Sequence, residues 1–252
     1  MKKGFWIILC MFFIPPVTFA GNMKLHYDRP AEYFEEALVI GNGTMGATLY
    51  GGVKKDKISF NDITLWTGEP ESENSSPDAF NTIPEIRALL DNEDYQGADK
   101  AQYKVQGHYS ENYQPLGTLT IEYLDDTAGI SDYHRWLDIG NATARTQYLK
   151  DGKLFTSDYF ASAPDSVIVI RLKSENKEGI HALLSFDSPL PHSSQVADNE
   201  ISVEGYAAYH SFPVYYKAED KHRYDPERGI HFKTLVRVLS VDGSVKNRYS
   251  DS

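Results

Sequence analysis

Alternating apolar and polar positions dominate the chain and predict short β-strands. Side chains of a strand point alternately to its two faces, so each alternating segment can bury one face and expose the other. The clearest alternations lie at residues 118–123, 144–149, 154–160, 166–172, 181–186, 200–204 and 232–239. Lys150-Asp151-Gly152-Lys153 joins two of them, and Asp-Gly between alternating residues favours a tight hairpin. Regular strands at this spacing predict a mainly β fold, an antiparallel two-sheet β-sandwich of the super-sandwich type.

Residues 83–106 depart from this alternation and show the spacing of helices. Pro84 can open a helix at its first turn, where the missing N–H needs no partner. A second short helix is expected after Asp94. The apolar positions of the first helix are Ile83, Ile86, Leu89 and Leu90, and those of the second are Tyr95, Ala98, Ala101 and Val105. We therefore expect two short helices inserted between strands, packed on one face or end of the sandwich.

The first 20 residues have the layout of a secretory signal peptide. Lys2 and Lys3 precede the apolar run Phe5–Ile14, and a cleavage pattern ends at Ala20. The apolar run rises only about 15 Å as a helix, about half of the hydrocarbon core of a bilayer, so it is too short to span a membrane. We expect cleavage after Ala20, a mature domain of residues 21–252 without a membrane span, and a secreted or periplasmic location.

The C-terminal residues predict an open sheet edge. The strand at 232–239 is followed by a turn at Val241-Asp242-Gly243-Ser244, shortly before Ser252. Natural proteins usually cover such an edge. We therefore expect a truncated piece that lacks the C-terminal part of its sandwich. An alternative hypothesis from the same edge is a non-functional remnant that aggregates.

Composition excludes several classes of partner and site. The chain has 25 basic and 36 acidic residues and a net charge of −11, which repels phosphate backbones and anionic lipid, so neither nucleic acid nor a membrane surface is expected as a partner. Cys10 is the single cysteine and lies in the segment to be removed, so no disulfide or thiolate metal site is expected. The eight histidines show no zinc-binding spacing. We expect no metal and no cofactor.

Gly41-x-Gly43-x-x-Gly46 matches the dinucleotide-binding pattern letter for letter. That mechanism needs a helix to begin at the glycines, so that its N-terminal amides meet the pyrophosphate. Thr48-Leu-Tyr-Gly51-Gly52 instead favours a strand followed by a turn, because paired glycines stop a helix. The pattern therefore predicts a glycine-rich β-turn.

Three short cassettes carry the most specific information in the chain. They are residues 40–47 (IGNGTMGA), 61–68 (NDITLWTG) and 113–117 (YQPLG). In this order and spacing they resemble the N-terminal β-sandwich domain of glycoside hydrolase family 95, the α-L-fucosidase-like enzymes. The resemblance continues through Arg135-Trp136-Leu137-Asp138 and residues 158–165 (DYFASAPD), and is good over residues 25–175.

The resemblance implies a function for the intact enzyme and a role for this domain. The enzyme would hydrolyse terminal fucose, or a related sugar, from glycans with inversion of configuration. The domain would pack against a helical catalytic barrel, which in the family holds the catalytic acid and the residues that activate water. We therefore assign no catalytic residue to this chain and expect it to be structural and inactive alone.

Four residues are candidates for contacting a sugar. Flat aromatic faces suit the C–H face of a sugar ring, and amides suit its hydroxyls. The candidates are Asn61, Trp66, Tyr113 and Gln114, with Tyr109, Asn112 and Trp136 as further possibilities. The competing interpretation is that the aromatic residues are buried in the core and that Gln-Pro-Leu-Gly is only a tight turn. An alternative function from a different class is a free-standing, non-catalytic carbohydrate-binding module that docks a glycan on Trp66 and Tyr113.

Overall fold

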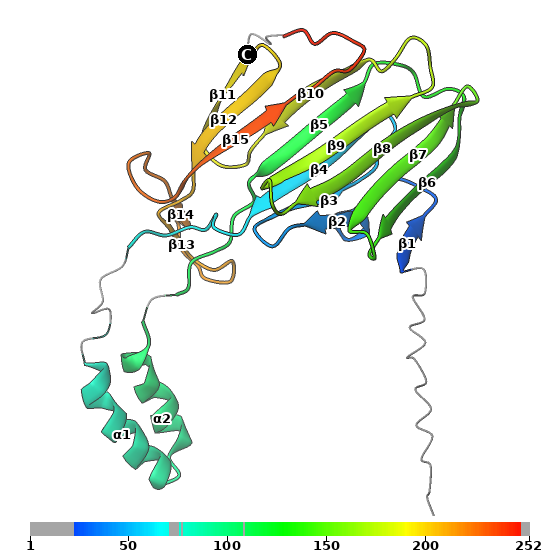
Figure 1. Ribbon diagram of the computed structural model, residues 1–252. Helices are drawn as coiled ribbons and strands as arrows, with labels where there is room; N and C mark the ends of the chain where they lie inside the picture. Colours follow the sequence, from blue (N-terminus) through cyan, green and yellow to red (C-terminus); the bar gives the residue numbers. More distant parts are fainter. Residues whose placement is uncertain (1–22, 71–75, 77, 108, 248–252) are drawn as a thin grey trace, which may run out of the picture.

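The computed structural model describes residues 23–247 apart from 71–75, 77 and 108 (Figure 1). The predicted signal peptide, with Cys10 and the cleavage position after Ala20, lies outside the described residues, so cleavage and export stay predictions. None of the helices in the described ranges has the length and apolarity that crossing a bilayer requires.

Two five-stranded antiparallel sheets form the two layers of the fold (Figure 1). The first sheet has, in spatial order, β1 (Lys24–Tyr27), β6 (Ile130–Asp138), β7 (Thr143–Lys150), β8 (Lys153–Ser162) and β9 (Val167–Ser174). The second has β10 (Ala182–Asp187), β5 (Gly117–Tyr123), β4 (Lys55–Asp62), β3 (Met45–Leu49) and β2 (Leu38–Gly41). A short 3-10 turn, η1 (Phe34–Glu36), precedes β2. This architecture confirms the predicted mainly β, antiparallel sandwich.

A smaller sheet continues the fold beyond β10. It contains β11 (His192–Ala197), β12 (Glu200–Tyr206) and β15 (His231–Arg237) in that order, and the short pair β13 (His210–Ser211) and β14 (His222–Arg223) lies below it (Figure 1). The predicted turn at 241–244 is a bend in which the Gly243 amide donates to the Ser240 hydroxyl. No strand follows it within the described residues up to 247, so the predicted hairpin is not formed there and β15 is an edge strand.

The core lies between the first and second sheets. Alternate residues of β5, from Gly117 to Tyr123, are buried, as the sequence pattern predicts for a half-buried strand. Side chains from both layers meet in one cluster, which includes Leu38, Leu49, Ile58 and Ile121 from the second sheet and Ala144, Tyr148, Phe155 and Tyr159 from the first. Burial of this apolar surface is the main force that holds the two layers together.

The two glycine-containing turns have the predicted form. Asp151 and Gly152, between β7 and β8, both have positive φ (50° and 72°), as a two-residue hairpin turn requires. Gly41 and Gly46 face each other across the β2–β3 hairpin, and Asn42 closes its turn by accepting bonds from the amides of the residues that follow. No helix begins at these glycines, so the pattern forms the predicted glycine-rich β-turn and does not form a dinucleotide-binding site.

The predicted helices exist, but their position differs from the expectation. They are α1 (Ala79–Asp91) and α2 (Tyr95–Gln102), followed by the 3-10 turn η2 (Tyr103–Val105). Asp94 caps α2 by accepting a bond from the Gly97 amide. Pro84 lies inside α1 and does not open it, so that expectation is wrong. The helix tolerates the proline because only one hydrogen bond is lost, the one to the carbonyl of the exposed Phe80.

The helix pair does not pack on the sandwich, so that expectation is wrong. Figure 1 shows α1 and α2 standing clear of the sheets at the end of two connecting segments. We call the helix pair and its two connecting segments the arm (residues 68–111). The buried Ala98 and Ala101 of α2 are small enough to let α1 approach closely, so the two helices pack against each other, while Ile83, Leu90 and Tyr95 stay more than a third exposed.

Candidate functional site

The two segments that connect the arm to the sandwich cross at its base. Trp66 and Tyr113 form an isolated antiparallel bridge, with one hydrogen bond from Thr67 N to Asn112 O (2.8 Å) and one from Gln114 N to Leu65 O (2.9 Å). Residues paired in this way, between two ladder bonds, bring their side chains close together. The Trp66 and Tyr113 rings accordingly lie edge to face, 5.5 Å apart, and both are exposed by more than two fifths.

The structure brings three of the four predicted sugar-binding residues together. Gln114 adjoins the pair of rings, and its side chain reaches only the carbonyl of Tyr113, at 3.4 Å. The indole N–H of Trp66 donates to Ile63 O at 3.0 Å, which fixes the ring, and the side chain stays partly exposed beside Tyr113. Asn61 lies apart on β4, opposite Gly46, and has no side-chain hydrogen bond to a described residue. The arrangement is suited to stacking an apolar ring face, with few polar groups to orient it.

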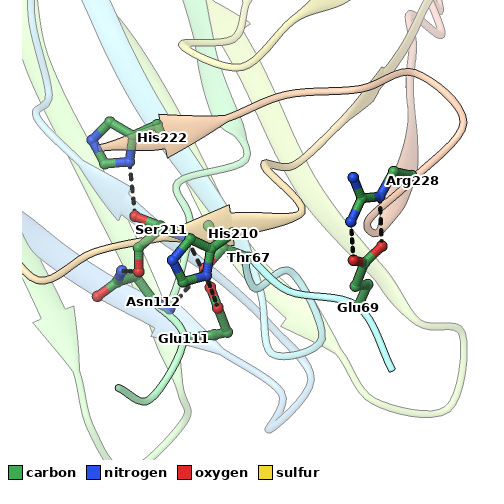
Figure 2. Close-up of polar contacts among 8 residues, drawn as sticks. All are labelled: Thr67, Glu69, Glu111, Asn112, His210, Ser211, His222 and Arg228. Carbon is green, nitrogen blue, oxygen red and sulfur yellow. Dashed lines mark hydrogen bonds and ion pairs between the residues drawn. The ribbon is translucent and has the colours of Figure 1, made fainter. Parts of the chain in front are cut away.

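Glu111 organises the opposite side of the same crossing (Figure 2). Its carboxylate accepts a hydrogen bond from the Thr67 hydroxyl, one from His210 Nδ1 at 2.8 Å and one from the Ser211 amide at 3.1 Å. The Thr67 hydroxyl in turn accepts from the Asn112 amide at 2.9 Å. Hydrogen bonds to an ionised acceptor are about twice as strong as neutral ones, so Glu111 joins the arm base to β13.

A serine and a histidine also meet beside Glu111, but not as a nucleophile and base. Ser211 Oγ lies 2.7 Å from His222 Nδ1, and the Ser211 carbonyl accepts from the Asn112 side chain at 3.0 Å (Figure 2). Ser211 is fully buried, so its hydroxyl is closed to a substrate. The contact therefore serves to hold β13 and β14 together.

Gly68 can only be glycine where the arm leaves the sandwich. Its φ is +117°, and a Cβ at this position would lie 2.9 Å from Glu111 Cγ. Its amide donates to Ala208 O at 3.0 Å, which brings the chain close to the third sheet. The next residue, Glu69, forms an ion pair with Arg228 (Figure 2), and hydrogen bonding to this guanidinium lowers the pKa of the Glu69 carboxyl. The arm base is therefore fixed on both sides.

Comparison with known proteins agrees with this architecture. The family model described as "Glycosyl hydrolase family 65, N-terminal domain" matches residues 25–252. The chain belongs to this family. The match confirms the resemblance to the N-terminal β-domain of fucosidase-type glycoside hydrolases.

Curated relatives of this family 65 N-terminal domain carry fucosidase names. "Alpha-L-fucosidase 2" of Arabidopsis thaliana is 31% identical over 233 residues, which are 89% of this chain and 28% of the relative. "Probable alpha-fucosidase A" of Aspergillus niger is 28% identical over 179 residues, or 67% of this chain and 22% of the relative. The chain thus spans about a quarter of the length of the relatives it matches.

The remaining sequence candidates of this family 65 N-terminal domain lie on two other surfaces. Tyr109 packs against Tyr215 and Tyr216, with ring centroids 6.3 and 5.3 Å apart, on the β13–β14 side of the arm base. Trp136 lies on the outward face of the first sheet, opposite Arg145 of β7. Within the described ranges, His, Cys, Asp and Glu side chains form no group of three or more arranged to hold a metal ion.

Sequence reasoning missed the Glu111 network. Its members come from residues 67, 111–112, 210–211 and 222, which are separated by up to about 150 positions, and each is an ordinary polar residue in its local context. Gly68 was the one local signal, because a glycine after Trp-Thr in a turn indicates a close approach or positive φ.

Proposed function

We propose that this chain is the N-terminal β-sandwich domain of an exported family 95 glycoside hydrolase. The intact enzyme would hydrolyse terminal α-L-fucose, or a related sugar, from glycans with inversion. The supporting observation is the 31% identity to "Alpha-L-fucosidase 2" across 89% of the chain, together with the family match over residues 25–252. The relatives are about three times as long as this chain, which supports a catalytic barrel in a portion outside this sequence.

In this proposal the domain is structural and has no catalytic carboxyl pair of its own. Glycoside hydrolysis normally needs two carboxyl groups facing the substrate from about 5–10 Å apart. Two carboxyls lie at the arm base. Glu69 is paired with Arg228, and the oxygens of Glu111 are occupied by Thr67, His210 and Ser211. Glu111 is therefore suited to positioning the arm and not to protonating a leaving group.

Fucose release tests this proposal. The purified chain is expected to release no fucose from a 2-fucosylated oligosaccharide, and a form extended by the proposed downstream barrel is expected to release it. Proton NMR of the first-formed sugar checks the mechanism, because inversion gives β-L-fucose. Release by the chain alone would refute the structural role, and no release by the extended form would refute the fucosidase assignment.

Export is tested separately. We expect the protein in the secreted or periplasmic fraction to begin at Gly21, as read by N-terminal sequencing. A cytoplasmic protein that retains residues 1–20 would refute this part of the proposal without affecting the enzyme class.

The second candidate function, a free-standing carbohydrate-binding module, is favoured by the exposed Trp66–Tyr113 pair. Titration calorimetry of the chain against a panel of neutral glycans distinguishes the two. A binding module would give saturable binding that Trp66→Ala abolishes, whereas a structural domain would give millimolar binding or none at this place.

A further inference from the structure

The outward face of the first sheet carries a continuous polar row across all five strands. Strand register aligns His26 of β1 with Trp136 of β6, Trp136 with Arg145 of β7, Arg145 with Asp158 of β8, and Asp158 with Arg171 of β9. A second row runs parallel to it through His134, Gln147, Thr156 and Lys173. The inward neighbours Arg135, Ala144 and Tyr159 are buried, so these two rows face away from the core.

A depression opens on this face around Trp136. It has a volume of about 320 Å³ and is lined by Lys24, His26, His134, Trp136 and Gln147. This volume lies at the lower end of the range of small-molecule sites, about 300–1,000 Å³. The depression lies on the first sheet and is therefore separate from the arm base, which is built from the β4–β5 connection and β13.

The lining residues have hydrogen-bonding groups that the fold does not use. Within the described part of the chain, the Trp136 indole N–H, the Gln147 amide and the His26 imidazole have no side-chain hydrogen bond, and His134 Nδ1 is buried without a partner. At the arm base, by contrast, Glu111 and its neighbours satisfy one another. Unused donors beside an aromatic face are what a sugar ring with its hydroxyls requires.

This face carries two cations that make no ion pair. Asp138 pairs with Lys24 at 3.3 Å and Asp158 pairs with Arg145, while Asp132 lies 3.2 Å from His134. Arg171 and Lys173 make no ion pair with any described residue and are exposed. A chain with a net charge of −11 therefore presents uncompensated cations on one face of one sheet.

We propose that this face binds an acidic oligosaccharide, a glycan whose sugar rings bear carboxylates. One ring would lie in the depression beside Trp136, whose indole also has the Arg145 guanidinium 5.7 Å from its ring centroid, and Gln147 and His26 would bond its hydroxyls. The row from β6 to β9 crosses three strand spacings, about 14 Å, so a short oligosaccharide can extend from Trp136 towards Arg171 and Lys173. Those two cations would meet its carboxylates. This site is independent of the fucosidase assignment, since it uses none of the arm-base residues.

The test compares two probes that differ only in charge. Trigalacturonate and its fully methyl-esterified form are titrated against the purified chain by calorimetry and by tryptophan fluorescence. We expect saturable binding of trigalacturonate, weakened several-fold by a rise in salt, and at least about tenfold weaker binding of the ester. No saturable binding, or equal binding of the two forms, would overturn the proposal.

Variants place the binding on the sheet. Trp136→Ala is expected to raise the Kd for trigalacturonate at least about tenfold, and the exposed pair Arg171→Gln with Lys173→Gln to raise it several-fold and reduce its salt dependence. Phe80→Ala, which removes an exposed aromatic side chain of α1, is the matched control and is expected to leave the Kd unchanged. Unchanged binding in both sheet variants, or loss of binding in Phe80→Ala, would overturn the location. Equally tight binding of a DNA oligonucleotide would overturn the sugar class. Thermal melting of each variant verifies that it is folded.

Discussion

Asp56 provides the sharpest test of how the two layers of the sandwich are joined. It lies on β4 with 1% of its surface exposed, and its carboxyl accepts a bond from the Gly52 amide at 2.9 Å and from the Tyr159 hydroxyl of β8 at 2.8 Å. Burial raises its pKa from 3.8 to about 6, because the charged form loses its hydration. The hydrogen bonds from Gly52 and Tyr159 oppose this rise but do not cancel it.

The raised pKa makes stability depend on pH in a defined direction. The folded state holds the proton of Asp56 more tightly than the unfolded state, so the contribution of this group is fully present below pH 3.8 and is lost as pH rises through about 6. A shift of about two units corresponds to about 3 kcal/mol in total. Between pH 5 and pH 8, the free energy of unfolding should fall by roughly 1–2 kcal/mol on account of this one group.

Asp56→Asn removes the titration while keeping the side-chain shape. We expect urea unfolding at pH 5, 6, 7 and 8, followed by tryptophan fluorescence, to show that the variant gains roughly 1–2 kcal/mol relative to the parent chain as pH rises from 5 to 8. Other groups titrate equally in both proteins, so the difference isolates Asp56. Parallel pH profiles of the two proteins would refute the reasoning. Asp56→Ala is the control for lost bonds, and should be about 2–5 kcal/mol less stable at every pH because Gly52 and Tyr159 lose their partner.

Three further predictions concern the arm and its base. Gly68→Ala should lower the free energy of unfolding by about 1–3 kcal/mol, since φ is +117° and the added carbon would meet Glu111. Gly43→Ala is the control and should lower it less, because φ is +97° there but the space around the residue is open. Equal losses in urea unfolding would contradict the contact between position 68 and Glu111. Glu111→Gln should weaken the bonds from His210 and Ser211 and increase hydrogen exchange of the Ser211 amide, with a loss of about 1–3 kcal/mol; unchanged exchange would show that the carboxylate does not hold β13. Replacing residues 71–106 by a flexible Gly-Ser linker should leave the thermal midpoint within a few degrees of the parent, because the helices pack on each other and not on the sheets; a large fall in calorimetry would contradict that independence.

The strands could be predicted from the sequence because their signals are local. Residues 118–123, 144–149 and 154–160 alternate, and the structure places strands at each of them with boundaries within two residues. Asp151-Gly152 likewise specifies its own turn through positive φ. The placement of the helix pair could not be predicted, because an apolar helix face does not reveal whether it will meet a sheet or another helix.

The candidate site could be predicted only in part, for a related reason. Trp66, Tyr113 and Gln114 could be picked out because they lie in two of the short cassettes of the sequence, and the structure joins them through a bridge between residues 47 positions apart. The network around Glu111 depends on residues from β13 and β14, whose contact with the arm base is set by tertiary structure alone. The polar rows on the first sheet become visible only when strand register is known, since one residue of slippage would turn every side chain to the other face.

The bridge between Trp66 and Tyr113 also makes the folding of the sheets largely independent of the length and content of the arm. Together with the bonds of Glu111 it fixes the two ends of the arm close together, so the helix pair beyond them enters the folding equilibrium mainly through the entropy of closing a loop. Doubling the length of such a loop changes the free energy by only about 0.6 kcal/mol. Insertions, deletions or a different pair of helices at this position would therefore change stability little while β4 and β5 keep their register.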